Sequence, residues 1–121
     1  MTTESNNNFE NLRSKINSSL EKAKQEMEEL SVQFSLGKAE AADKFESVKK
    51  DFLSKVNEWK IKGEQFKASG EEKSQTFKSK LEELQVQLAL GKAEAKELFH
   101  EQKKKIMQSI SDLETEIKKR F

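Results

Sequence analysis

Apolar residues recur along this chain with the period of an α-helix. When each residue is turned by about 100° relative to the one before it, the apolar positions fall in one sector of roughly 100°. Counted from Leu30, this stripe holds Phe9, Leu12, Ile16, Leu20, Ala23, Met27, Phe34, Gly37, Ala41, Phe45, Val48, Phe52, Val56, Trp59 and Phe66. Counted from Leu84, it holds Phe77, Leu81, Leu88, Gly91, Ala95, Phe99, Ile106, Ile110, Leu113 and Ile117. The pattern predicts an all-α fold of long helices that each bury one stripe.

One reversal of the chain is predicted near residues 68–71. Ser69 followed by Glu72 fits a capping box, and Gly70 can adopt the left-handed conformation that ends a helix. The expected single domain is a long antiparallel hairpin. Its parts are a disordered tail at 1–7, helices over about 8–68 and about 71–121, and two internal repeats over about 23–67 and 77–121.

A twelve-residue phrase occurs twice in the chain. LSVQFSLGKAEA spans residues 30–41, and LQVQLALGKAEA spans residues 84–95. The alternation of apolar and polar residues in the first copy is also the pattern of a β-strand. The flanking segments favour helix, however, and they lack the glycine, proline and asparagine residues that bound strands. We therefore interpret both copies as helix.

The glycine of each copy falls inside the apolar stripe. Gly37 is followed one turn later by Ala41, and Gly91 is followed by Ala95. A glycine inside a helix costs about 1 kcal/mol relative to alanine, so a compensating role is expected. Small residues four apart let another helix backbone approach closely, which predicts a packing notch at each pair. A ligand cavity or a bend in the helix are the alternatives.

A second, shorter apolar stripe lies almost opposite the first. It contains Val32 and Leu36 in one copy of the phrase, and Val86 and Leu90 in the other. Because a two-helix hairpin buries only one stripe, the second stripe predicts a partner. The simplest partner is another copy of the chain, giving a homodimer or higher homo-oligomer in which hairpins pack as a four-helix bundle. A lipid or polymer surface is the alternative.

The tandem phrase, written L-x-V-Q-[FL]-x-L-G-K-A-E-A, resembles one in uncharacterised bacterial α-helical proteins of predicted coiled-coil type. The resemblance covers twelve residues in each copy. It implies a helical coiled-coil fold and a bacterial origin, and it implies no activity.

Composition narrows the class of protein. Charged residues make up 37% of the 121 residues and apolar residues 33%, and proline is absent, as is typical of long helices. A net charge of +1 gives no electrostatic reason to expect a nucleic-acid partner. The N-terminus lacks the features of a secretory signal, and no apolar run approaches the ~18 residues of a membrane span. We therefore expect a cytoplasmic location.

Few residues are candidates for chemistry. His100 is the only histidine, and with Glu97 it forms half of the ligand set of a di-iron bundle. The equivalent positions in the other repeat are Glu46 and Asp43, which do not complete the set. The sequence therefore predicts no metal site, no cofactor and no catalytic residues, with His100 at the surface. The basic run 103–105 is interpreted as a solvated face, and Trp59 as part of the core.

These observations favour a non-enzymatic structural or protein-interaction coiled-coil protein that self-associates. The alternative is an amphipathic surface-coat protein that binds lipid or polymer granules, similar in design to phasins or apolipoproteins. In that alternative, the stripe of Val32 and Leu36 would meet the coated surface.

Overall fold

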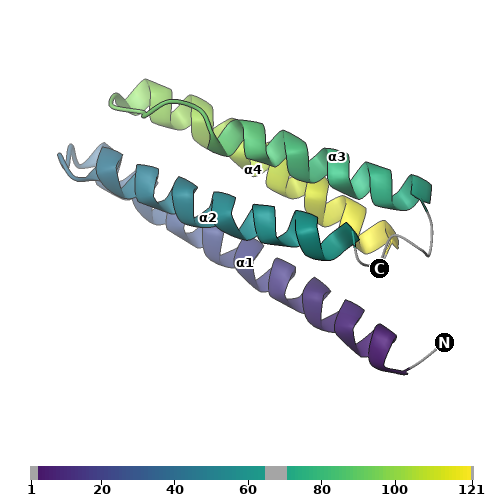
Figure 1. The fold of residues 1–121 in the computed structure, drawn as a ribbon. Helices are drawn as coiled ribbons and strands as arrows, with labels where there is room; N and C mark the ends of the chain where they lie inside the picture. The colour runs from purple at the N-terminus through teal and green to yellow at the C-terminus, as the bar shows by residue number, and fades with distance from the viewer. Residues whose placement is uncertain (1–2, 65–70, 121) are drawn as a thin grey trace.

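A computed structural model describes residues 3–64 and 71–120 of the chain, and these residues form four helices without a strand (Figure 1). The helices are α1 (Thr3–Ser35), α2 (Ala41–Glu64), α3 (Glu71–Leu88) and α4 (Lys96–Arg120). The predicted all-α fold is confirmed. Helix α1 begins at Thr3, so it includes most of the segment expected to be a disordered tail.

The four helices pack side by side as an antiparallel bundle. Helix α1 packs against α2 and α4, and α3 packs against α2 and α4. The connections 36–40 and 89–95 lie together at one end of the bundle, which we call the loop end (Figure 1). The C-terminus of α2 and the N-terminus of α3 lie at the other end. This is an up-down-up-down arrangement with two layers.

The predicted core stripe lines the interior of the bundle. The buried apolar residues, taken in chain order, are Leu12, Ile16, Leu20, Ala23, Met27, Leu30, Phe34, Ala41, Phe45, Phe52, Val56, Trp59, Phe77, Leu81, Leu84, Leu88, Ala93, Phe99, Ile106, Ile110, Leu113 and Ile117. All but Ala93 belong to the stripe, which confirms the helical reading of the pattern. Burial of each large apolar side chain contributes about 1.5–3 kcal/mol.

The structure does not contain the two long helices that the sequence predicted, because each is interrupted within the repeated phrase. Residues 36–40 separate α1 from α2, and residues 89–95 separate α3 from α4. The physical reason for the interruption is that it lets the chain bury more of its apolar stripe. A two-helix hairpin leaves much of its apolar surface open, whereas a hairpin folded back at its middle covers one half with the other. The second layer of the bundle is thus supplied by the same chain.

Folding back preserves the pairing expected of the hairpin. Lys24 of α1 forms an ion pair with Glu114 of α4 at 2.9 Å, and Lys60 of α2 lies 3.4 Å from Glu82 of α3. Helices α1 and α4 therefore run beside each other as the hairpin predicts, and so do α2 and α3. The reversal predicted at Ser69 and Gly70 lies outside the described residues. Helix α2 ends at Glu64 and α3 begins at Glu71.

An aromatic cluster fixes the loop end of the core. The Phe99 ring stacks on Phe34 with centroids 4.2 Å apart and meets Phe45 edge-on at 4.8 Å. These rings come from α1, α2 and α4, so one cluster joins three helices. Such pairs add about 0.5–1.5 kcal/mol each beyond the area they bury.

We expect Phe99→Ala to lower the free energy of unfolding by about 3–5 kcal/mol, because it leaves a cavity among three helices. Leu98→Ala is the matched control, since its side chain is exposed, and it should change stability by less than about 1 kcal/mol. Urea denaturation followed by circular dichroism measures both. Equal losses in the two variants would contradict the described core.

Candidate functional site

Lys49, the ninth residue of α2, is fully buried near the loop end. Its Nζ donates hydrogen bonds to the carbonyl oxygens of Leu90 at 3.0 Å and Gly91 at 3.2 Å, and to Gln102 Oε1 at 2.9 Å. Glu46 Oε2 lies 3.1 Å from the same nitrogen as an ion pair. Lys49 thus reaches across the bundle to the connection between α3 and α4.

These contacts give a buried charge its partners. An ammonium group removed from water is strongly destabilising unless it is paired and hydrogen-bonded. The Leu90 and Gly91 carbonyls belong to the connection that follows α3, beyond the last helical residue, Leu88, and both accept hydrogen bonds from Lys49. Gln102 Nε2 also donates to the Gly91 carbonyl at 2.7 Å. We call the set Lys49, Glu46, Leu90, Gly91 and Gln102 the Lys49 network.

The first copy of the repeated phrase ends its helix without a buried lysine. Gly37 has a φ of 71°, and its N–H donates to the Phe34 carbonyl at 3.0 Å. The Lys38 N–H donates to the Gln33 carbonyl at 3.1 Å. Together these bonds form a Schellman motif, which satisfies the last carbonyls of α1 and requires a left-handed residue. Glycine adopts that conformation without the steric cost paid by other residues.

The two copies therefore end their helices in different ways. In the second copy, the Ala89 N–H is shared between the Gln85 and Val86 carbonyls, and the following carbonyls are bound by Lys49. The residue equivalent to Lys49 is Lys103 in α4. Its Nζ contacts Ser31 Oγ at 2.7 Å and Glu28 Oε1 at 2.9 Å within α1, rather than the connection that follows α1.

The predicted packing notch is wrong at both glycines. Gly37 and Gly91 are exposed, and a Cβ atom added to either would have no neighbour within 4 Å. Ala41 is buried at the start of α2, but Ala95 is exposed and Ala93 is buried instead. Each glycine lies in a connection, so a close approach between helix axes does not account for it. The C-terminal glycine signal of a helix was present in the sequence and would have identified Gly37.

The residues of the second stripe mostly face solvent within the single chain. Val32, Leu36 and Val86 are exposed by 58%, 68% and 61%. Leu90 is half-buried, and its backbone belongs to the Lys49 network. Leu98, exposed at the start of α4, adds a further apolar side chain at this end. Sequence reasoning missed Lys49 altogether, because a lysine adjoining an apolar stripe usually extends to water.

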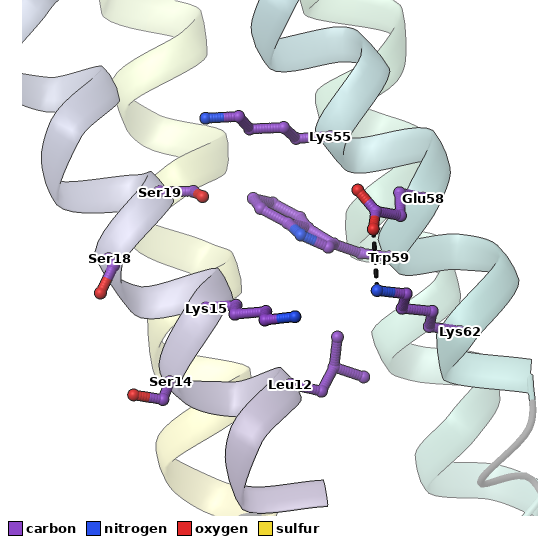
Figure 2. A pocket seen from close by; sticks show the side chains of 9 residues that line it. All are labelled: Leu12, Ser14, Lys15, Ser18, Ser19, Lys55, Glu58, Trp59 and Lys62. Atoms are coloured by element: carbon purple, nitrogen blue, oxygen red, sulfur yellow. Dashed lines mark ion pairs between the residues drawn. The ribbon is translucent and has the colours of Figure 1, made fainter. Parts of the chain in front are cut away.

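A groove runs along the outside of the bundle between α1 and α2. One hollow of about 450 Å³ lies over Trp59 and is crossed by lysines from both helices, as Figure 2 shows. Ser19 points toward the indole ring, whereas Ser14 and Ser18 point away from it (Figure 2). An adjoining hollow of about 320 Å³ shares Ser19 and Lys55.

The hollow over Trp59 is lined by charged side chains from both helices, including Lys15, Lys55, Glu58 and Lys62. Lys62 pairs with Glu58 at 2.8 Å, and this hydrogen-bonded lysine lowers the pKa of the Glu58 carboxyl. Trp59 is buried, as predicted for a core residue. The arrangement is that of charged side chains lying over a packed core.

The residues considered for metal chemistry are not assembled into a site. His100 and Glu97 are both exposed. Across residues 3–64 and 71–120, no group of three or more histidine or acidic side chains is placed to hold a metal ion. None of the described helices combines the length and apolar character needed to cross a bilayer.

Comparison with models of protein families, with curated proteins and with solved structures finds no match to this chain.

We expect Lys49→Met to lower the free energy of unfolding by about 1.5–3 kcal/mol, because it leaves buried hydrogen-bonding groups without their charged donor. Hydrogen exchange should also accelerate at residues 89–95. Lys50→Met is the matched control, since Lys50 is exposed, and it should have little effect on either measurement. Unchanged exchange at 89–95 in Lys49→Met would show that the network does not hold this connection.

Proposed function

We propose that this chain is a non-enzymatic structural or protein-interaction protein, a cytoplasmic helical bundle of coiled-coil type that self-associates. The observation that carries the proposal is the position of its exposed apolar side chains. Among the described residues, the large apolar side chains that are exposed are Val32, Leu36, Ile61, Val86 and Leu98. All but Ile61 belong to the loop end.

Several exposed apolar side chains at one end of the bundle are unusual for a chain so rich in charged residues. Single exposed apolar residues need no explanation, but the gathering of four of these five at one end of the bundle supports an interaction surface there. The repeat places Val32 and Val86 at equivalent positions on α1 and α3. A surface with two equivalent apolar positions suits a twofold contact, in which the same patch of each copy meets the other.

The charges around this end are also self-complementary. Each copy of the phrase carries a lysine and a glutamate two residues apart, at Lys38 and Glu40 and again at Lys92 and Glu94, and all of them are exposed. Both signs therefore surround the apolar residues. Opposite charges across a contact favour the correct partner and register. End-to-end association of two loop ends is the arrangement that this surface supports.

Support for a role outside catalysis comes from the charged groups themselves. Lys24, Lys49, Lys60, Lys62 and Lys103 each pair with an acidic group. In these pairs the charges join helices or turns of helix, which is a structural use.

We expect the combined substitution of Val32, Leu36 and Val86 by glutamate to shift the chain to monomer while its helix content and thermal stability stay nearly unchanged. The exposed side chains support no part of the core, and the added charges repel across a twofold contact. Sedimentation over a series of concentrations measures the association. Ile61→Glu, at the other end, is the control and should leave association unaltered.

Association of the triple variant as strong as that of the unmodified chain would contradict the proposed surface. Light scattering with and without lipid vesicles separates the coat-protein alternative, which predicts binding that the three glutamates abolish. Scattering unchanged by vesicles, with self-association lost in the triple variant, is the result expected here.

A further inference from the structure

We propose that the bundle is the closed form of a chain that also opens at residues 36–40 and 89–95, giving a hairpin of two continuous helices that exchanges its contacts with a second opened copy. This deepens the proposed self-association by naming a second mode of pairing between copies. The closed and exchanged forms would share one set of helix contacts, made within a chain in one case and between chains in the other.

The first observation is the phase of the apolar stripe. Buried residues on both sides of each connection occupy the same sector of a continuous helix, as with Phe34 and Phe45, or Leu88 and Phe99. A loop that only reverses the chain does not require the two stripes to share one sector, because each helix can rotate about its own axis until its stripe faces the core. A continuous helix requires it.

The second observation is the composition of the connections. The first reads Leu-Gly-Lys-Ala-Glu, and the second holds the same five residues. Apart from glycine, all are among the strongest helix formers, and proline is absent. Hydrogen bonding of helical type already extends past α1, since the Leu36 N–H donates to the Val32 carbonyl at 3.0 Å.

The third observation is topology. Both connections lie at the loop end (Figure 1), so straightening both extends the two arms in one direction. The α1–α4 and α2–α3 pairs, represented by Lys24–Glu114 and Lys60–Glu82, remain within the chain as the two halves of one long hairpin. The α1–α2 and α3–α4 contacts are lost, and a second opened chain restores them. This is domain swapping, in which identical contacts form between copies.

Two features hold the closed form. Gly37 supplies the left-handed residue of the Schellman motif, and the Lys49 network binds the carbonyls of Leu90 and Gly91. In a continuous helix these carbonyls would accept the helix's own N–H groups, and Lys49 would lose them. Gly91 has no left-handed conformation, so the two glycines should respond differently to substitution.

The test uses three variants of the full chain. Gly37→Ala strains the closed form and favours continuous helix, which together amount to on the order of 30-fold per chain. Because two chains open, dimerisation should strengthen on the order of 10³-fold. Gly91→Ala gains only the helix preference, about fivefold per chain, or roughly 25-fold for the dimer.

Ala39→Pro has the opposite effect. Ala39 is exposed and occupies the second position of a turn closed by the Ala41 N–H and the Lys38 carbonyl, at 3.1 Å. Proline is favoured there, and it breaks a continuous helix. Ala39→Pro should therefore fold and form no exchanged dimer.

The readout is a distance within one chain. The chain contains no cysteine, so Ser19→Cys and Ser54→Cys provide two unique sites for spin labels. Both line the same hollow between α1 and α2, so they are close in the closed form. In a continuous helix they are about 50 Å apart. Dilution with unlabelled chain leaves only the distance within one molecule.

We expect dimers of Gly37→Ala to show the long distance, Gly91→Ala to dimerise more weakly, and Ala39→Pro to keep the short distance at every concentration. Dimers that keep the short distance would overturn the exchange while leaving end-to-end association intact. Equal effects of Gly37→Ala and Ala39→Pro, or a Gly37→Ala chain that stays monomeric, would overturn it as well. If dimers show the long distance but resist the Val32, Leu36 and Val86 substitutions, the exchange stands and the end-to-end surface does not.

Discussion

Each of the four described helices carries one apolar stripe, and the fold depends on burying that stripe against other helices. The described helices have few apolar residues beyond that stripe, so none is stable alone in water. Two helices pressed together cover part of each stripe, and a second layer covers the rest. The four-helix bundle meets this requirement within one chain, and the aromatic cluster of Phe34, Phe45 and Phe99 joins three of its helices.

The repeated phrase shows how one sequence can serve two structural tasks. In the first copy, Gly37 is used for its backbone conformation. In the second, Lys49 of α2 binds the carbonyls of Leu90 and Gly91, which follow the helix end. The equivalent lysine, Lys103, contacts the side of α1 instead. The repeat is therefore symmetric in its apolar pattern and asymmetric in its polar contacts, so the two connections differ in what stabilises them.

The closed bundle does not bury all of its large apolar side chains. Exposed apolar side chains collect at the loop end, surrounded by charges of both signs. The same end contains the two segments at which the chain departs from continuous helix. Association between copies thus has two physical routes there, one through the surface of the closed bundle and one through its opening. The routes differ in which contacts lie within a chain.

The sequence alone determined the helical character, the buried face of each helix and the pairing of α1 with α4 and of α2 with α3. The helical character and the buried faces follow from periodicity, which is a local property of successive residues. The pairing follows from the reversal predicted near residues 68–71, and folding back preserves it. Only the tertiary structure decided that the helices end at Ser35 and Leu88 and that Lys49 is buried. A helix continues through a glycine or stops there according to the apolar surface that folding back covers, and that surface belongs to residues far away in the chain. The apolar pattern of the sequence is the same whether the stripe is buried by the same chain or by a second copy. The pattern could therefore predict a four-helix bundle but not the number of chains that form it.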